Sequence, residues 1–355
     1  MKAKVISYLE KDHWNNFVAS MPGGSVLQTY EWGEFKSAFG WQPIRLMLEE
    51  DEKIVAGISI LKREIPFINH CFFYAPRGPV LDFGRKELLQ ELLETVEKEA
   101  DRQHAISLKI DPEILEEESN VLANLRSLGF EKALKEVQPR ATFVLDLNRS
   151  LEEILMGFEE KTRYNVRLAE KKGVEVKEEA SEKGVRLFYG LYLETARRDK
   201  FLIHPLIYYQ KLQQILFPAG MGTVFLAYYQ GKPIAGVIIF TLGEKAWYMY
   251  GASASEFRNV MPNHLLHWEV IKWAKARGIK QYDLWGIPAC PTESHPLYGV
   301  YRFKKGFRGK LVKYLGAYNF PYSPLFYHVL EYGIAWWQNL RSLLTKGKIE
   351  DSLGE

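Results

Sequence analysis

One segment late in the chain combines cations and aromatic side chains at a spacing that could build a site for negative charge. In the sequence FKKGF, Phe303 and Phe307 are four residues apart. The lysines between them are Lys304 and Lys305. If residues 299–306 turn helically, the two phenylalanines share one buried face, and a lysine is held at its edge. A fixed ammonium group stabilises an oxyanion that develops during a reaction. We predict that Lys304 is this cation and that Phe303 shapes its pocket; Lys305 is the rival, and a solvated surface lysine is the alternative.

A second candidate cation, Lys36, lies in the first half of the chain. Trp32 and Trp41 flank it, and the segment predicts a short helix that leads into a strand. A lysine held among aromatic side chains can anchor a phosphate or a peptide carboxylate. The alternative is again an ordinary surface lysine.

Asp111 follows a predicted strand over residues 105–110, at a position where a residue could face a binding site. Its carboxylate could accept a proton from a reacting amine. The alternative is that Asp111 fixes the turn before Pro112. The sequence favours neither role.

Three polar residues in the second half, Arg198, His204 and Tyr208, form a further candidate set for ligand binding. Tyr208 follows His204 by four residues, which would put both on one face of a helix. We expect this set to contact a substrate.

The segment 161–172 predicts a strongly basic helix. Arg163, Arg167 and Lys171 recur at intervals of four residues and therefore share one face. A solvated basic face is the common meaning of such a run. Contact with phosphate groups is the alternative.

The composition limits the function classes that can apply. The chain has 355 residues, enough for two domains, with 47% hydrophobic and 26% charged residues, as in ordinary water-soluble proteins. A net charge of +3 excludes a general nucleic-acid binder, so any such contact must be local. Two cysteines, Cys71 and Cys290, fit a reduced cytoplasmic protein without disulfides or a metal site. We expect neither a signal peptide nor a membrane span.

The two halves of the chain resemble one unit used twice. KIVAGISIL matches KPIAGVIIF, and CFFYAPRGPV matches AWYMYGASAS. Ala56 aligns with Ala235 and Asp111 with Ile287, so the offset stays between 176 and 179 residues. Each half predicts strands, a long helix and a strand in the order of an acetyltransferase-like (GNAT-type) unit. We predict an α/β fold of two tandem GNAT-type domains that face each other across a cleft.

The predicted boundaries give a first domain of residues 1–147 plus 320–345 and a second domain of residues 148–319. Residues 323–344 predict a final amphipathic helix loaded with aromatic residues, among them Phe326, Trp336 and Trp337. We expect it to pack back on the first domain. The alternative is contact with a membrane surface, where such side chains settle.

The usual cradle for coenzyme A is missing from this double unit. An acetyltransferase binds the pyrophosphate with backbone N–H groups at a glycine-rich helix start. The corresponding stretch here is RNVMPN, residues 258–263, which has no glycine, and Pro262 removes one N–H donor. We therefore predict an acyl donor other than coenzyme A, and no cofactor.

Segments along nearly the whole chain resemble the FemABX family of aminoacyl-tRNA-dependent transferases, which build the side bridges of peptidoglycan. The matching segments are LQTYEWGEFKSAFGW (27–41), APRGPV (75–80), KIDP (109–112), KTRYNVRLAEKKGV (161–174), RRDKFLIHPLIYY (197–209), KPIAGVII with MYGASA (232–254), and VYRFKKGFRGKLVKYLGAY (300–318). The long coiled-coil arm of some members is missing, because the helix pair 182–217 is too short for it. His204 departs from the basic residue expected in its segment.

The resemblance implies that an amine of a peptidoglycan stem peptide attacks the ester of an aminoacyl-tRNA. The acceptor would be lipid II or UDP-MurNAc-pentapeptide, bound by the first domain, and the second domain would take the aminoacyl-tRNA. The enzyme would act as a monomer in the cytoplasm, with peripheral contact to the inner membrane surface left open. The implied residues are Lys304, Phe303 and Asp111 for catalysis, Lys36, Trp32, Arg77, Arg198, His204, Tyr208 and Tyr250 for substrate binding, and Arg163, Arg167 and Lys171 for tRNA binding.

Two other classes of function stay open on the sequence alone. One is an acyltransferase of the same double fold with another donor, or with a polysaccharide or peptide amine as acceptor. The other is a module that binds tRNA or cell-wall precursors without catalysis. The intact FKKGF segment favours an enzyme over a binding module, and the missing cradle disfavours a coenzyme A donor.

Overall fold

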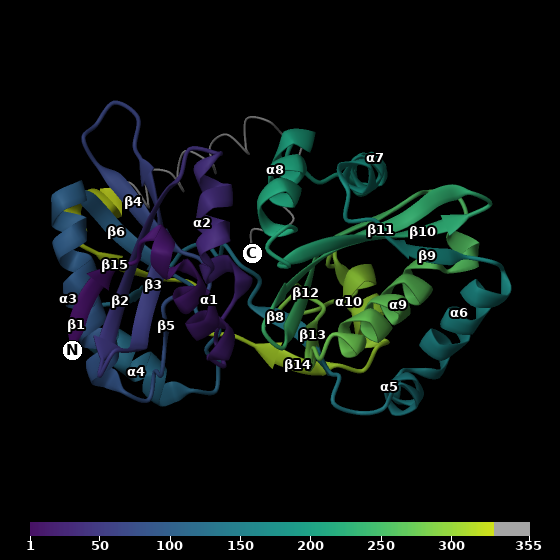
Figure 1. The fold of residues 1–355 in the computed structure, drawn as a ribbon, viewed down its shortest axis with the longest axis horizontal. Coiled ribbons are helices and arrows are strands. Elements are labelled where there is room, and N and C mark those ends of the chain that lie inside the picture. The colour runs from purple at the N-terminus through teal and green to yellow at the C-terminus, as the bar shows by residue number, and fades with distance from the viewer. Residues whose placement is uncertain (330–355) are drawn as a thin grey trace. The chain divides into compact units, whose positions relative to one another are not determined.

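The computed structural model describes residues 1–329, which form two compact units (Figure 1). Unit 1 combines Met1–Gln138 with the segment that begins at Tyr314, and unit 2 is Pro139–Lys313. The chain therefore leaves unit 1, builds unit 2 and returns.

Unit 1 is built on a mixed sheet. Its strands are β1 (Lys2–Val5), β2 (Gln42–Glu50), β3 (Lys53–Glu64), β4 (Cys71–Ala75), β5 (Val80–Leu81), β6 (Ala105–Ile110), β7 (Glu131–Lys132) and β15 (Tyr318–Pro321). They follow the order β1-β2-β3-β4-β6-β15-β7, and β5 pairs with β3. The helices are α1 (Lys11–Ser20), α2 (Tyr30–Ser37), α3 (Lys86–Gln103) and α4 (Ser119–Ser127), with short 3₁₀ turns η1 (Tyr8–Glu10) and η2 (Val26–Gln28).

Alternation along β3 gives the unit 1 sheet two covered faces. Ile58 and Ile60 point into the core cluster that contains the leucines of α3. Gly57 points to the other face, where a Cβ atom would collide with the ring of Trp14 from α1. Helices α1 and α2 therefore lie on the side opposite to α3.

Unit 2 contains a second mixed sheet. Its strands are β8 (Ala141–Asp146), β9 (Glu175–Glu178), β10 (Gly222–Tyr229), β11 (Lys232–Leu242), β12 (Lys245–Ser253), β13 (Gln281–Asp283) and β14 (Lys310–Lys313). They follow the order β14-β8-β13-β12-β11-β10-β9. The helices are α5 (Leu151–Gly157), α6 (Glu160–Lys171), α7 (Glu182–Asp199), α8 (Leu206–Leu216), α9 (Pro262–Ala276) and α10 (Tyr298–Lys305), with the 3₁₀ turn η3 (Arg258–Val260).

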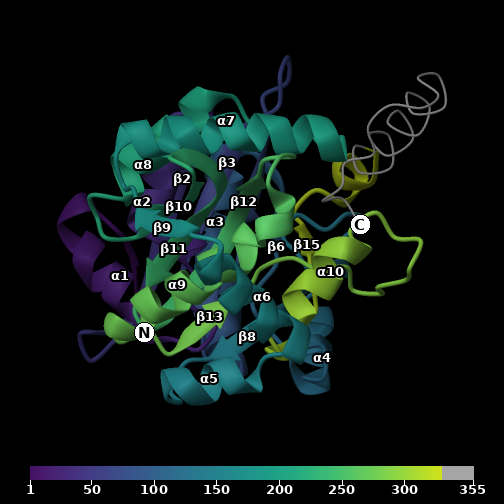
Figure 2. The same ribbon diagram turned by 90° about the vertical axis from the view of Figure 1, so that its right-hand side faces the viewer.

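Helices α7 and α9 cover opposite faces of the unit 2 sheet, as Figure 2 shows. Phe188 of α7 packs where a Cβ atom on Gly236 would stand. Trp273 of α9 packs edge-on against Phe225 of β10, with ring centroids 5.3 Å apart. The sheet is thus buried on both sides in its centre.

The predicted repeat is confirmed by the strand pairing. In unit 1, β3 and β4 are antiparallel, α3 crosses over, and β6 lies parallel to β4. In unit 2, β11 and β12 are antiparallel, α9 crosses over, and β13 lies parallel to β12. Each unit therefore has the predicted acetyltransferase-like order.

The predicted domain boundary at residue 147 differs from the boundary in the structure. Strand β8 pairs with β13 and β14 and so belongs to unit 2. Strand β15 pairs with β6 and so returns the chain to unit 1 before residue 320. Each unit needs an antiparallel strand beside its crossover strand, and the sequence does not reveal which segment supplies it.

The predicted final helix over residues 323–344 lies mostly outside the described residues, and so do Trp336 and Trp337. Its first part, up to Val329, is helical. Phe326 stacks on His70 with a centroid distance of 5.1 Å, so this part packs on unit 1 as expected. Within residues 1–329, no helix has both the length and the apolar character needed to span a membrane.

Candidate active site

Lys304 of α10 points into the interior of unit 2, and only 6% of its surface is exposed. Its Nζ donates to the carbonyl oxygens of Trp285, at 3.2 Å, and of Gly286, at 2.7 Å. The ammonium group also lies over the ring of Tyr248, 5.2 Å from its centroid. The sequence predicted a cation at the edge of a buried pair, whereas the side chain is itself buried. Lys305 is exposed, with its Nζ over the ring of Tyr301 at 5.9 Å from the centroid.

Burial and a nearby carboxylate set the charge of Lys304. Burial lowers the pKa of Lys304 to about 7, and Asp283 opposes this by raising it. The Asp283 carboxylate accepts hydrogen bonds from the Thr142 hydroxyl and from the backbone N–H of Trp285, the latter at 2.6 Å. Asp283 therefore also holds the turn whose carbonyls bind the lysine. Near neutral pH, Lys304 exists in both protonation states.

An uncharged aromatic wall lines the other side of α10. Phe307 is buried and Phe303 is half-buried, and their rings pack edge to face at 5.3 Å. His267 packs against both rings at 5.4 Å. Burial, then the charge of Lys304, lowers the pKa of His267 to about 3, so this imidazole is neutral. Its Nδ1 lies 2.8 Å from the Tyr282 hydroxyl.

Strand β12 connects Lys304 to the tyrosine-rich part of unit 2. Tyr248 contacts the lysine, and Tyr250, two residues later, packs edge to face against Tyr209 at 5.5 Å and against Tyr192 at 6.3 Å. Burial raises the pKa of Tyr250 well above its usual value, so the phenol stays neutral. Tyr250 and Tyr248, the tyrosine that contacts Lys304, thus lie two residues apart on one strand.

The second-half set lies beside strand β12. His204 stacks on the buried ring of Tyr208 with a centroid distance of 3.9 Å. The two do not share a helical face as predicted, because α8 begins at Leu206 and His204 precedes it. Arg198 donates to the carbonyl of Ser253 at 2.9 Å and pairs with the neighbouring Asp199.

The basic face of α6 divides into two parts. Arg163 donates to the carbonyls of Met156 and Phe158 at the end of α5, so it has a structural role. Arg167 and Lys171 are exposed. Two of the three predicted phosphate-binding residues are therefore available to solvent.

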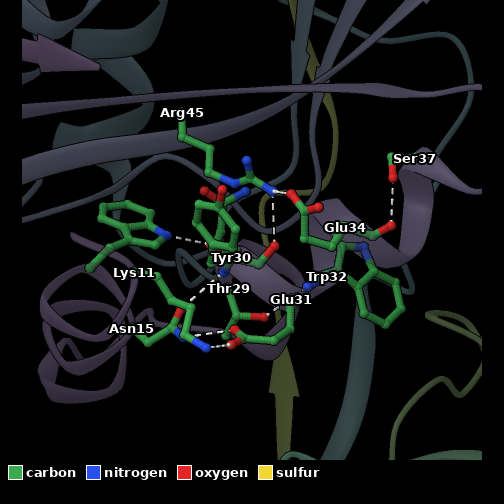
Figure 3. A network of polar contacts seen from close by, with 11 residues as sticks. Lys11, Asn15, Thr29, Tyr30, Glu31, Trp32, Glu34, Ser37 and Arg45 are labelled. Carbon is green, nitrogen blue, oxygen red and sulfur yellow. Dashed lines mark hydrogen bonds and ion pairs between the residues drawn. The ribbon is translucent and has the colours of Figure 1, made fainter. Parts of the chain in front are cut away.

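In unit 1, a polar network fixes helix α2 (Figure 3). The Asn15 amide donates to the Glu31 carboxylate at 2.7 Å. The buried Arg45 donates to Glu34 at 2.7 Å and to the Tyr30 carbonyl at 2.9 Å, and its guanidinium lies 3.7 Å from the Tyr30 ring centroid. These bonds at the start and middle of α2 position the residues that follow on it.

Helix α2 carries the predicted residues Trp32 and Lys36. Trp32 is buried and packs against Phe35 at 5.3 Å. Lys36 is half-buried, and its pKa is lowered to about 8 by burial and, to a smaller extent, by the positive charge of Arg63. Arg63 in turn lies over the ring of Trp41 at 5.1 Å. Lys36 is thus part of a basic and aromatic corner of unit 1.

Asp111 and Arg77 lie together in the interior of unit 1. Asp111 is fully buried and accepts hydrogen bonds from the Tyr74 hydroxyl at 2.8 Å and from the Arg77 backbone N–H at 2.6 Å. Burial raises the pKa of Asp111, while Arg77 opposes this. The Arg77 guanidinium lies 3.8 Å from Glu113 and 4.8 Å over the Tyr314 ring. Asp111 therefore fixes the turn after β4 rather than the turn at Pro112, and both its oxygens are occupied.

The helix start that would hold a pyrophosphate in an acetyltransferase is unsuited to that role here. Turn η3 precedes α9, and Pro262 is its first residue. Met261 just before it adopts φ of 54°, a conformation that favours glycine. We expect acetyl-CoA neither to bind at low micromolar concentration nor to support turnover. Calorimetry and an amine acetylation assay check this, and tight binding with acetylation would contradict it.

Sequence reasoning missed the residues that surround Lys304. Tyr248, Asp283 and Thr142 each come from a different strand, and only the fold brings them to the lysine. The segment DLWG contains Asp283, and this polar residue in an apolar run was the available signal.

Comparison with known proteins gives the same family from sequence and structure. The family model described as FemAB family matches residues 9–230 and 222–333. A lipid II:glycine glycyltransferase from Staphylococcus saprophyticus is 27% identical over 403 residues, covering 94% of this chain and 95% of that protein. The protein with the same name from Staphylococcus aureus strain MRSA252 is 27% identical over 423 residues, and the alignment covers 97% of this chain and 99% of that protein. Both alignments are longer than this chain, so these relatives hold residues without a counterpart here.

Solved structures agree with the fold. The crystal structure of FemX superposes with a TM-score of 0.87 at 25% identity, covering 93% of this chain and all of that chain. A tandem GNAT protein from the clavulanic acid biosynthesis pathway has a TM-score of 0.54 at 11% identity and shows likeness of fold alone.

Proposed function

We propose, since this chain belongs to the FemAB family, that it transfers an amino acid from an aminoacyl-tRNA to the stem-peptide amine of lipid II. The enzyme is a transferase of peptidoglycan bridge formation; the donor, the acceptor and the amino acid are the proposed parts. Unit 1 would bind the precursor and unit 2 the aminoacyl end of the tRNA. We also propose that the enzyme acts as a monomer in peripheral contact with the membrane surface.

The observation that carries the proposal is the ammonium of Lys304 held by two backbone carbonyls. These carbonyls accept two of its three N–H groups, and the third can donate to a substrate. In the reaction, the amine nitrogen bonds to the ester carbon and the carbonyl oxygen becomes an oxyanion. The third N–H would stabilise that charge. The nitrogen then loses a proton, the bond to the ribose oxygen breaks, and the ribose oxygen takes up a proton to leave as a hydroxyl. The oxyanion is where a buried cation has its largest effect.

One assay distinguishes the two possible donors, aminoacyl-tRNA and an acyl thioester, and the two possible acceptors, lipid II and UDP-MurNAc-pentapeptide. Purified enzyme is incubated with glycyl-tRNA and lipid II, and the product is identified by its mass. We expect one aminoacyl addition per acceptor, with none from uncharged tRNA. Transfer only to UDP-MurNAc-pentapeptide would place the acceptor in the soluble pool, and transfer only from an acyl thioester would replace the proposed donor.

The tRNA contact predicts a salt effect on α6. Replacing Arg167 and Lys171 by alanine should raise the KM for aminoacyl-tRNA and lower the slope of log KM against log salt by about two, one for each lost phosphate contact. Arg149→Ala/Lys183→Ala removes the same charge from exposed positions of unit 2 and serves as the control. An unchanged slope in the α6 variant would show that Arg167 and Lys171 face solvent and do not contact the tRNA.

A further inference from the structure

The loop between β3 and β4 presents bare apolar side chains to solvent at one end of unit 1. Figure 1 shows this loop projecting beyond the end of the sheet. Phe67 is fully exposed, with a relative accessibility of 105%, and the neighbouring Ile68 is 43% exposed. Burial in unit 1 therefore cannot explain an aromatic residue at this position.

The backbone at Phe67 strengthens this argument. Ile68 N–H donates to the Ile65 carbonyl at 3.5 Å, which closes a four-residue turn with Pro66 in its second position. Phe67 takes the third position with φ of 72°, where glycine or asparagine is usual. A bulky side chain in this conformation is strained.

A second apolar element lies at the same end of unit 1. Both views place the segment after β15 beside this end of the sheet (Figures 1 and 2). Phe326 stacks on His70, the last residue of the β3–β4 loop. Leu325 and Val329, one helical turn apart, are 76% and 62% exposed. We call Phe67, Ile68, Leu325 and Val329 the apolar end.

The charges around the apolar end favour an anionic surface. Residues 65–70 contain no acid. At the base of the loop, Glu64 lies 3.5 Å from Lys62, and Arg63 adds a further exposed cation. His70 and His104 lie beside the loop with ring centroids 6.3 Å apart, and Gln103 of α3 bridges Lys62 and the acid Glu99. Beyond Val329, the sequence continues with Trp336 and Trp337, residue types that settle at bilayer interfaces.

We propose that the apolar end inserts into the headgroup region of an anionic membrane and docks unit 1 beside the lipid-linked acceptor. The inference rests on the proposed function, because a lipid-linked acceptor requires the enzyme to reach the bilayer. Burial of exposed aromatic and aliphatic side chains at that depth lowers the free energy of the bound state. Flanking cations lower it further through attraction to anionic headgroups. The strained turn keeps Phe67 exposed to solvent in the unbound protein, so that it is already in position to insert.

Vesicle binding tests the apolar end directly. The full chain is sedimented with phosphatidylcholine vesicles, with and without phosphatidylglycerol. We expect binding that needs the anionic lipid, and at least a tenfold weaker partition for Phe67→Glu/Ile68→Glu. The control is Leu9→Glu, which changes another exposed leucine of unit 1 at 92% accessibility. Absence of binding by the native chain, or equal binding by the double variant, would overturn the proposal.

Activity assays separate this proposal from the proposed function. The double variant should show about a tenfold higher KM for lipid II in vesicles and an unchanged KM for lipid II dispersed in detergent. If the native chain binds vesicles but transfers to lipid II in neither form, the proposed function fails and the membrane-binding surface stands. If the native chain forms a dimer in sedimentation without lipid, and Phe67→Glu abolishes the dimer, the surface belongs to a second copy and the membrane proposal fails.

Discussion

Replacing Lys304 by methionine should lower kcat by roughly 10²–10³-fold, about the effect of losing one oxyanion donor. The reason is that the ammonium interacts more strongly with the oxyanion than with the neutral ester, so its loss is felt in the transition state. Methionine has a similar length and fills the buried space around Tyr248 without a charge. Single-turnover rates with charged tRNA and precursor measure the effect.

The neighbouring lysine supplies the matched control. Lys305→Met changes the same charge one position away, on the exposed side of α10, and should alter kcat by less than about threefold. Circular dichroism and thermal unfolding should show both variants folded, and precursor binding should be retained. A near-normal rate for Lys304→Met, or a larger loss for Lys305→Met, would mean that the catalytic cation has been assigned to the wrong residue.

Local patterns in the sequence were enough to predict most elements of both units. The leucines of the segment 86–103 recur at helical spacing, and Leu88, Leu89 and Leu92 are all buried against the sheet. The repeat between the β3 and β11 segments predicted two similar units, because segments of similar sequence in the same order form the same supersecondary unit. The spacing in FKKGF likewise predicted a helical turn with Phe307 inside.

Contacts between distant segments were beyond the reach of one sequence. Thr142 and Asp283 are 141 positions apart, and nothing local shows that a hydroxyl and a carboxylate meet beneath Lys304. Just after strand β13, Trp285 takes φ of 58°, which turns its carbonyl and that of Gly286 toward the lysine. The burial of Lys304 follows from this turn, so its lowered pKa could not be anticipated.

That lowered pKa leads to the second large effect. At alkaline pH the native enzyme should lose its rate advantage over the Lys304→Met variant. Burial favours the neutral amine, so the ammonium form predominates only below about pH 7. The substrate amine titrates as well, and the informative quantity is the ratio of the native rate to the Lys304→Met rate, in which the substrate contribution cancels. This ratio should be largest below about pH 7 and should then fall about tenfold per pH unit until the two enzymes are equally slow.

Asp283 gives the same prediction an independent check. Its carboxylate raises the pKa of Lys304, so Asp283→Asn should move the fall of the ratio to lower pH. The asparagine carbonyl can still accept hydrogen bonds from Thr142 and from the Trp285 N–H, which keeps the turn in place. The ratio for Asp283→Asn is taken against the double variant Asp283→Asn/Lys304→Met. A ratio that grows with pH would show that Lys304 acts as the neutral amine and accepts the proton of the attacking nitrogen. A flat ratio would show that its charge has no part in the reaction.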